Sequence, residues 1–353
     1  MKLKDFLYQV THWETWHHHV KYIPIAPVWI WYCIRSGTPW FFTSSNPSLT
    51  FGGFEGEGKK EMYEQLPPDS FPHTIYITPG IPFEEVKKQM EDAAFKYPFI
   101  VKPNVGMMGF MFRKITEPQQ LKLYHETMPI EYLIQELVSY PMEVSAFYYK
   151  LPGESRGHIS GFLKKEPPYL KGDGVSTIEN LIHANEGIRL KKEDVLLKHS
   201  AKLKDVLAPG EMYFLSYASN RNQGGKLTGI DHEIDETLQQ LITGFSQYPQ
   251  PFYYGRYDIK CNSVEDLKAG KNFSILEFNG AGAGTQHIYA NRYSLWKACA
   301  IILFHWKMLF LISRKNRESG VKAWGVLEGW RHLKAAKKNL MMLKKMNEKF
   351  PSF

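Results

Sequence analysis

Short segments of alternating apolar and polar residues fill the middle of the chain, and glycine or proline separates most of them. Alternation with a period of two predicts β-strands over residues 73–78, 98–102, 111–115, 132–138, 143–150, 252–260 and 273–278. A helical period predicts α-helices over residues 59–65, 82–97, 117–126 and 177–184, the last with Ser176 or Thr177 as N-cap. Because helices and strands are mixed along the chain, the pattern predicts an α+β fold.

The two ends of the chain differ from the middle. Residues 1–56 are rich in aromatic side chains and show no regular period, and the glycine cluster that follows predicts a loop at 51–58. Near the other end, the pattern predicts an apolar helix over residues 294–313 and a basic amphipathic helix over 329–349. The apolar segment includes two lysines and a histidine, whereas a membrane-spanning helix has about 20 apolar residues with few charges. We therefore expect this segment to be buried or to lie at an interface.

Length and composition add an expectation about domains. The chain has 353 residues, of which 43% are hydrophobic and 23% are charged, and these values are typical of a folded protein. Beyond about 250–300 residues a single core stops growing, so we expect more than one lobe. The predicted boundaries are an atypical N-terminal region at 1–70, an α+β domain at 71–293 with lobes at 71–140 and 141–293, and a C-terminal pair of helices at 294–353.

Cysteine usage and charge indicate the compartment and the partners. Three widely spaced cysteines without a CxxC pair disfavour a disulfide framework and a zinc site. The first residues, MKLKDFLYQVTHWETWHHH, contain no apolar run of secretory-signal type, so we expect the protein in the cytoplasm. Residues 321–353 carry eight Lys and Arg against two Glu, which is +6 of the formal net charge of +8.

This basic tail has two interpretations. It can lie on the inner, anionic face of a membrane with its lysines at the headgroups, as a peripheral contact. Alternatively, it packs its apolar face on the body of the protein and leaves its lysines in water. We expect no nucleic-acid partner, and a homodimer remains open.

Charged residues adjoin glycine or a strand end at three places far apart in the sequence. At the first, Lys102 ends an apolar strand ahead of a turn that contains Gly106 and Gly109. A lysine and the backbone N–H groups of such a turn can bind phosphate oxygens, although a lysine at a strand end is more often simply solvated. At the second, the strand at 132–138 can meet an adenine edge and Glu143 can meet ribose hydroxyls; an edge strand with surface acids is the alternative.

The third place is a candidate metal site. Asp258 lies within the strand at 252–260, and Glu277 and Asn279 share one face of the next strand because they are two residues apart. Two carboxylates and an amide oxygen suit Mg²⁺, which binds one or two carboxylates together with substrate phosphates. Arg256 shares a strand face with Asp258. It either stabilises a transferred phosphoryl group or a developing oxyanion, or it forms a structural salt bridge with Asp258.

Taken in order, the segments PFIVKP, LIQELV, GRYDIK and ILEFNGAGAGTQH resemble the ATP-grasp superfamily, specifically its D-alanine:D-alanine ligase-like and cyanophycin synthetase-like branches. The resemblance runs from about residue 59 to about residue 287. It implies an ATP-grasp fold, in which two α+β lobes clamp ATP, with Mg²⁺ or Mn²⁺ as the metal. The segments GDG at 172–174 and NRNQGG at 220–225 are similar to the cyanophycin and glutathione-synthesising branch, although GDG is equally a turn before a capped helix.

The resemblance also implies roles for individual residues. It places Lys102 on the ATP phosphates and Arg256 on the oxyanion as catalytic groups, with the metal ligands Asp258, Glu277 and Asn279. The nucleotide contacts that it implies are Lys59 or Lys60, Lys102, Gly106, Gly109, Gln135, Glu136, Val138, Glu143 and Asn222. The glycines Gly280, Gly282 and Gly284 occupy the acceptor loop, which lacks the serine of D-alanine ligases, so dipeptide synthesis is in doubt.

The implied reaction is ATP-dependent ligation. A substrate carboxylate attacks the γ-phosphate to give an acyl phosphate, and a nucleophile, most often an amine, then displaces phosphate. The expected substrates are a small-molecule or lipid-linked carboxylate and amine. Two alternatives remain from other classes: a kinase on the same fold that releases a stable phosphorylated product, and a non-catalytic nucleotide-binding module at the membrane.

Overall fold

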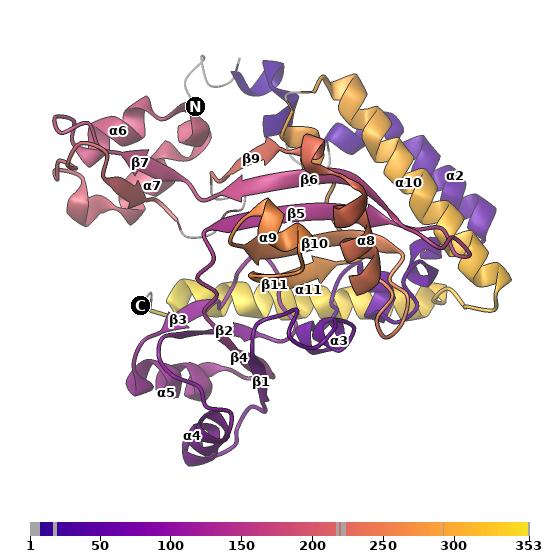
Figure 1. Ribbon diagram of the computed structural model, residues 1–353, viewed down its shortest axis with the longest axis horizontal. Helices are drawn as coiled ribbons and strands as arrows, with labels where there is room; N and C mark the ends of the chain where they lie inside the picture. Colours follow the sequence, from indigo (N-terminus) through magenta and orange to yellow (C-terminus); the bar gives the residue numbers. More distant parts are fainter. Residues whose placement is uncertain (1–7, 17–19, 217–218, 220–223, 292, 352–353) are drawn as a thin grey trace.

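Two antiparallel sheets organise the part of the chain that the computed structural model describes, residues 8–16, 20–216, 219, 224–291 and 293–351 (Figure 1). The smaller sheet has the strand order β1-β4-β2-β3, and the larger has the order β11-β10-β5-β6-β9. Strands β7 and β8 form a further two-stranded sheet. Helices lie among and around these sheets, so the α+β fold class expected from the sequence is confirmed.

The smaller sheet is the basis of what we call the small lobe. Its strands and helices are β1 (Thr74–Ile77), β2 (Phe99–Pro103), β3 (Arg113–Ile115), β4 (Tyr132–Glu136), α4 (Phe83–Asp92) and α5 (Pro118–Thr127). Val86 and Leu121 of the helices pack with Phe99 and Val101 of β2 in one core. Helix α4 ends before the predicted residue 97 because Ala94 has a left-handed backbone (φ 55°) and a proline follows at position 98.

The larger sheet carries a core on each of its faces. Its strands are β5 (Met142–Tyr149), β6 (His158–Glu166), β9 (Lys226–Gly229), β10 (Tyr254–Cys261) and β11 (Phe273–Asn279). Helices α8 (Glu236–Phe245) and α9 (Val264–Lys268) cover one face, where Tyr148 and Tyr257 point. On the other face, Phe147 and Tyr254 pack against the aromatic N-terminal region. Phe41, Phe42 and Phe51 of the N-terminal region are therefore core residues of the larger sheet.

A separate subdomain projects from the larger sheet, at the left of Figure 1. It comprises β7 (Tyr169–Lys171), β8 (Met212–Phe214), α6 (Ile178–Ala184) and α7 (Lys192–Lys198), which share a core of their own. The side chain of Thr177 caps α6 by accepting a hydrogen bond from Asn180 N (3.2 Å). Asp173 accepts bonds from Val175 N and Ser176 N, so the GDG segment is the turn before this capped helix.

The N-terminal region contains a helix that the sequence pattern does not predict. Helix α2 (Ala26–Ser36) begins with a proline in its first turn and ends at Gly37, whose left-handed backbone (φ 68°) accommodates the C-cap. Apolar residues occur all round its surface, so the segment shows no amphipathic period. The expectation of an irregular region at 1–56 is therefore wrong over this stretch.

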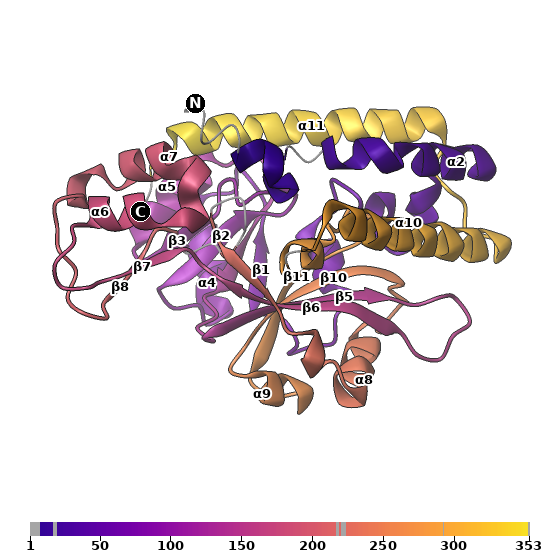
Figure 2. The same cartoon turned by 90° about the horizontal axis from the view of Figure 1, so that it is seen from above.

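Helix α10 (Leu295–Glu318) lies beside α2 (Figures 1 and 2). Ile302, His305, Leu309 and Ile312 line its buried face, at the spacing of one helical stripe. By length and composition α10 is able to cross a membrane, but 39% of its most apolar 18-residue window is buried within the protein. One face of the helix is thus part of the core, whereas Trp296 on the opposite face is exposed.

Helix α11 (Val326–Lys349) runs behind the two sheets and ends beside β3 (Figure 1). At its start, Leu333 packs on the aromatic core of the larger sheet. At its end, the fully buried Leu343 and the adjoining Phe350 belong to the core of the small lobe. The helix therefore packs its apolar face on the body of the protein, and it connects the two lobes.

This packing predicts that the tail contributes to stability. Leu343→Ala should lower the free energy of unfolding by about 2–5 kcal/mol, because it leaves a cavity in the small-lobe core. Met341→Ala, on the exposed side of the same helix, should change it by no more than about 0.5 kcal/mol. Urea unfolding followed by circular dichroism measures both values, and equal effects would show that α11 is not packed as described.

Candidate functional site

The candidate site lies on β10 and β11, at the side of the larger sheet nearest the small lobe (Figure 1). Arg256 lies opposite Asn279, and Asp258 lies opposite Glu277. Residues directly opposite each other in an antiparallel pair share a face, and so do residues two apart on one strand. All four predicted residues therefore lie on one face of the sheet.

A β-bulge follows this group of residues. The register shifts so that Ile259 lies opposite Ile275, which leaves Leu276 as the additional residue of β11. Bulges commonly re-aim side chains next to functional sites, and they release backbone groups from the ladder. Here the bulge keeps Glu277 opposite Asp258, and the carbonyl oxygen of Leu276 accepts a hydrogen bond from Tyr63 Oη (2.6 Å).

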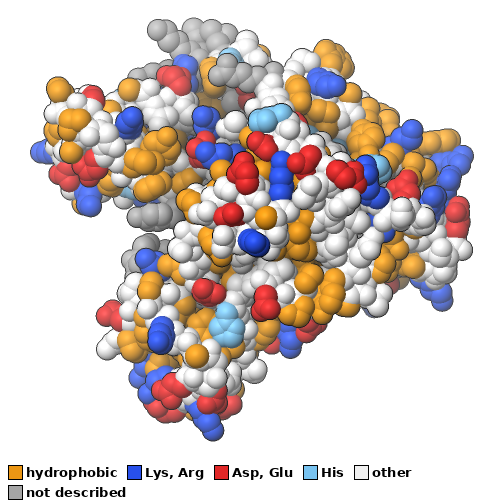
Figure 3. Space-filling view, in the orientation of Figure 1, with side chains coloured by type: hydrophobic (Ala, Val, Ile, Leu, Met, Phe, Trp, Pro, Cys, Tyr) orange, Lys and Arg blue, Asp and Glu red, His pale blue; other side chains and the backbone are white. Residues whose placement is uncertain are grey.

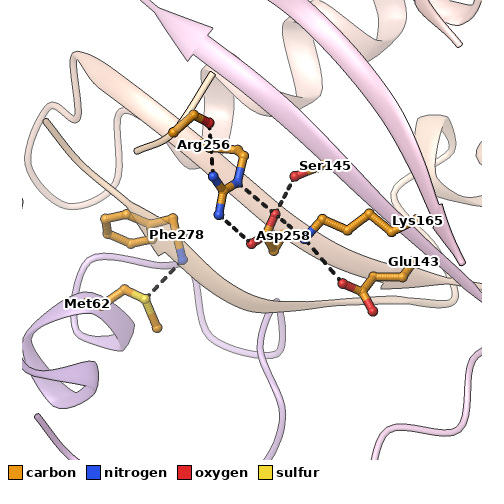
Figure 4. A network of polar contacts seen from close by, with 8 residues as sticks. Met62, Glu143, Ser145, Lys165, Arg256, Asp258 and Phe278 are labelled. Atoms are coloured by element: carbon orange, nitrogen blue, oxygen red, sulfur yellow. Dashed lines mark hydrogen bonds and ion pairs between the residues drawn. The ribbon is translucent and has the colours of Figure 1, made fainter. Parts of the chain in front are cut away.

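The short helix α3 (Lys59–Tyr63) is docked on this bulge. Besides the bond from Tyr63, the sulfur of Met62 accepts a hydrogen bond from Phe278 N (3.0 Å), as Figure 4 shows. Lys59 is the first residue of the same helix, so the bulge positions it as well. The helix predicted at 59–65 is confirmed, and its place on β11 explains how a residue outside the central sheets joins the site.

The hydroxyl group of Tyr63 joins the small lobe to the larger sheet. It donates to the Leu276 carbonyl and accepts bonds from Lys102 Nζ (3.3 Å) and Gln135 Nε2 (2.8 Å). A phenol has one proton and two lone pairs, so this arrangement uses its full capacity. The other donor of Gln135 is bonded to Thr74 Oγ1 (2.8 Å). Sequence reasoning missed Tyr63, because a single tyrosine in a five-residue helix carries no pattern.

Asp258 is the centre of a charged network (Figure 4). The guanidinium of Arg256 binds it through Nε and Nη2, both at 3.0 Å, and Lys165 Nζ lies 2.9 Å from Oδ1. The hydroxyl of Ser145 also donates to Asp258. Lys165 additionally contacts Glu143 Oε1 (3.3 Å). The salt bridge between Arg256 and Asp258 is thus present, and Lys165 and Ser145 are members that the sequence did not indicate.

Burial and charge set the protonation states in the site. Burial would raise the pKa of the Asp258 carboxyl, but the adjacent Arg256 and Lys165 outweigh it and hold that pKa well below its usual range. Burial lowers the pKa of Lys102 to about 8, with Glu277 acting in the opposite direction. Burial and repulsion from Lys102 also lower the pKa of Lys59 to about 8. Both lysines are therefore close to Glu277 and hold their protons weakly.

The two adjacent lysines of α3 point in different directions. Lys59 Nζ donates to the carbonyl oxygen of Gly106 (3.1 Å), in the turn after Lys102. Lys60 is exposed, and its Nζ lies 5.4 Å from the ring centre of Tyr76. Lys59 is therefore the member of the pair that lies in the charged cluster. Gly109, in the same turn as Gly106, is exposed and has a left-handed backbone (φ 74°).

The segment expected to contact adenine lies beside the network. Glu136 ends β4 and its side chain is exposed. The carbonyl oxygen of Val138 accepts a bond from Lys260 Nζ (3.1 Å), which ties the linker between the lobes to β10. Glu143 is opposite Lys260 on one side and Lys165 on the other. Asn222 lies outside the described residues.

The glycine loop after β11 has a packing role at two of its three predicted positions. Ala281 N donates to Gly52 O and Gly282 N to Gly53 O, both at 3.0 Å. A Cβ at Gly280 or at Gly282 would overlap the backbone of residues 52–54. These glycines therefore permit two backbones to touch, and the amide of Gly282 is used within the protein. Only the third predicted glycine, Gly284, faces the network, where its carbonyl accepts from Arg256 Nη1 (3.1 Å).

The donor set fits a hard divalent cation. Over the described residues there is no cluster of three or more His, Cys, Asp or Glu, so a metal at this site would need the amide of Asn279 as well. The side-chain nitrogen of Asn279 is buried and has no hydrogen-bond partner among those residues. The same amide turned by 180° presents its oxygen there. An unsatisfied amide beside two carboxylates is consistent with a ligand set for Mg²⁺.

Comparisons with known proteins found no matching family model and no matching curated protein. Among solved structures, the chain is similar to a bifunctional glutathione synthetase from Pasteurella multocida (17% identity, 69% of this chain and 34% of that chain, TM-score 0.37). It is also similar to the VanG D-Ala:D-Ser ligase from Enterococcus faecalis (12%, 68% and 57%, 0.38) and to the D-alanine-D-alanine ligase from Coxiella burnetii (11%, 74% and 58%, 0.41). All three are ATP-grasp ligases, and the matches span from a third to somewhat over half of their lengths. Because all three TM-scores are below 0.5, the proposed function rests on the residues of the site.

The Tyr63 junction predicts a specific loss of stability. Tyr63→Phe keeps the ring and removes the hydroxyl, so buried groups of Leu276 and Gln135 lose a partner. The free energy of unfolding should fall by about 1–3 kcal/mol. The matched control is Tyr248→Phe, which removes an exposed hydroxyl and should leave stability unchanged. Denaturant titration measures the free energy of unfolding of both variants. If Tyr63→Phe is as stable as Tyr248→Phe, the hydroxyl of Tyr63 does not hold the small lobe to the larger sheet.

Proposed function

We propose that this protein is an ATP-dependent ligase that joins a substrate carboxylate to a nucleophile, most often an amine, through an acyl phosphate. The observation that carries the proposal is one charged cluster. Arg256, Asp258, Glu277 and Asn279 share a face of the larger sheet, and Glu277 acts electrostatically on Lys59 of α3 and on Lys102 of the small lobe. This combination of cations and hard oxygen ligands suits a metal–triphosphate complex. The four segments that resemble the ATP-grasp superfamily contain these residues, apart from Lys59.

Mg²⁺ would be held by Glu277, Asn279 and Asp258, and it would neutralise charge on the phosphate oxygens. Both oxygens of Asp258 are engaged by Arg256 in this structure. As a ligand, Asp258 would exchange at least one of these guanidinium contacts for the cation. The exchange would release Arg256, whose Nη1 is directed to the Gly284 carbonyl, for contact with the reacting groups.

Three lysines would bind the phosphates from two directions. Lys102 and Lys59 approach from the small lobe and α3, and Lys165 approaches from β6. Lys59 and Lys102, whose pKa values burial lowers, gain more from an incoming anion than exposed lysines do, whereas Lys165 is already paired with Asp258 and Glu143. The family resemblance implies that Glu143 contacts the ribose. In that case Glu143 would either release Lys165 or bind the ribose and Lys165 at the same time.

The chemistry needs positioning and charge stabilisation from the protein. The carboxylate oxygen of the substrate attacks the γ-phosphorus, and the bond from phosphorus to ADP breaks. The nucleophile then attacks the acyl carbon, phosphate leaves, and the attacking amine loses a proton. Arg256 would stabilise the negative charge that develops in each step, so a covalent protein nucleophile is not required. The substrates in this proposal are a small-molecule or lipid-linked carboxylate and amine.

Hydroxylamine tests the ligase proposal because it converts an acyl phosphate into a hydroxamate, which forms a coloured complex with iron(III). With ATP, Mg²⁺ and pools of amino acids, peptides and fatty acids, at least one pool should give ADP and hydroxamate together. Glu277→Gln should abolish both products, because it removes one charge from the metal site and keeps side-chain volume. Glu91→Gln, an exposed acid on α4, is the matched control and should be fully active.

Two results would contradict this assignment. If the folded Glu277→Gln variant releases ADP at an undiminished rate, Glu277 is not a ligand of the metal. Release of a stable phosphorylated product without hydroxamate would show that the protein is a kinase.

The depressed lysine pKa values predict proton uptake on nucleotide binding. At pH 8, Lys59 and Lys102 are each about half protonated, and bound phosphate favours their charged forms. Binding of Mg²⁺–ADP should therefore take up about one proton at pH 8 and much less at pH 6.5, and affinity should fall as the pH rises above 8. Calorimetry in buffers of different ionisation enthalpy measures the uptake. Lys102→Met should roughly halve it, whereas proton release at pH 8 would overturn the assignment of both lysines.

A further inference from the structure

The outer face of α11 is strongly basic. The cations exposed on this helix are Arg331, Lys334, Lys337, Lys338, Lys344, Lys345 and Lys349. Its sequence contains only two acids, Glu328 and Glu348, and Glu328 is bonded to the N-cap backbone of the helix (3.1 Å). The face seen in Figure 3, on the other side of the molecule, instead shows acidic and basic side chains mixed together.

Exposed apolar side chains adjoin this basic face. At the start of α11, Leu327 is 71% exposed and Trp330 is 60% exposed. On α2, Ile34 is 68% exposed and Trp31 is 55% exposed. Single exposed apolar side chains are common, but several of them gathered on one surface are typical of a site that meets a partner or a membrane.

The two helices present these side chains on the same side of the molecule. Trp40, just after α2, packs edge-on against Trp330 (5.7 Å between ring centres), and its indole N–H donates to Val326 O (3.1 Å). Figure 2 shows α2 and α11 at the same border of the molecule, while Figure 1 shows α2 next to α10 and at some distance from α11. The exposed apolar groups and the row of cations therefore belong to one surface, which we call the α2–α11 face.

We propose that the α2–α11 face docks on an anionic lipid bilayer. Tryptophan, isoleucine and leucine would enter the interfacial region, and the lysines would meet anionic headgroups. Charge complementarity favours a bilayer over a second copy of this chain. A symmetric dimer through this face would bring two identical rows of cations together, and like charges repel. The lysines of the tail thus bind lipid in this proposal although the apolar side of α11 is packed on the protein.

Docking in this orientation would place the site close to the membrane. The inner side of α11 contacts the turn after Lys102, where Asn339 Nδ2 donates to Val105 O (3.0 Å). The turn and the bilayer would thus be separated by one helix diameter, about 10–12 Å. None of the residues of the α2–α11 face belongs to the proposed catalytic cluster, so this inference stands independently of the ligase proposal.

Vesicle flotation of the full chain tests the inference. The vesicles contain phosphatidylcholine alone or phosphatidylcholine mixed with phosphatidylglycerol. The protein should float only with the anionic vesicles, and less so at high salt. Lys334→Gln, Lys338→Gln and Lys345→Gln combined should weaken binding on the order of 100-fold. Ile34→Ser with Leu327→Ser should weaken it at least about tenfold.

Matched controls remove lysines or an apolar side chain from other parts of the protein surface. The charge control replaces the exposed small-lobe lysines Lys88, Lys96 and Lys122 by Gln, and the apolar control is Leu197→Ser, at a position that is 78% exposed on α7. Both should bind like the unaltered protein. All substitutions are at exposed side chains, and equal thermal midpoints establish that each variant is folded.

Three outcomes would overturn the proposal. One is failure of the unaltered protein to float at low salt. Another is equal loss of binding in the controls. The third is a dimer, seen in sedimentation analysis, that the combined substitution Ile34→Ser and Leu327→Ser dissociates, while neither the dimer nor the monomer binds vesicles. This result would show that the α2–α11 face is an interface between copies of the chain.

Discussion

The hydroxyl of Tyr63 is the contact on which the geometry of the site depends. It donates to the carbonyl that the β-bulge exposes at Leu276, and it accepts from Lys102 and Gln135 of the small lobe. A buried hydroxyl with one donated and two accepted bonds has a single satisfactory position, because each lost partner leaves a polar group unpaired. The two sheets are thereby held with Lys102 near Glu277, and α3 is held with Lys59 in the same cluster.

The Asp258 network shows how such a cluster can be stable and still be ready to bind a ligand. Arg256, Lys165 and Ser145 satisfy the carboxylate, so the buried charge is paired. The same contacts occupy the proposed metal ligand. In our account, the nucleotide complex would replace one set of ionic contacts with another. Asp258 would hold the cation in place of part of its contact with Arg256, and the guanidinium would then be free to contact the reacting groups. The lowered pKa values of Lys59 and Lys102 are consistent with a site that favours an incoming anion.

The sequence predicted the α+β class, most of the strands and the two strands on which the four residues of the candidate site lie, because these follow from period-two alternation and from the position of charges within strands. It did not predict α2, whose apolar residues surround the helix and show no period. Lys165 and Tyr63 were missed for another reason. Their roles depend on which strands pair and where α3 docks, and neither is a local property of the chain. The glycines at 280 and 282 were predicted as a substrate loop, but the close approach of residues 52–54 accounts for them.

The central claim is that Asp258 changes partners when the metal–nucleotide complex binds. A crystal structure with Mn²⁺ and a non-hydrolysable ATP analogue tests this most directly, since the anomalous signal of manganese locates the ion. We expect the ion between Asp258, Glu277 and Asn279, the triphosphate against Lys59, Lys102 and Lys165, and Arg256 no longer bidentate on Asp258. Manganese at another place, or Arg256 still bound to both oxygens of Asp258 with the nucleotide in place, would contradict the account.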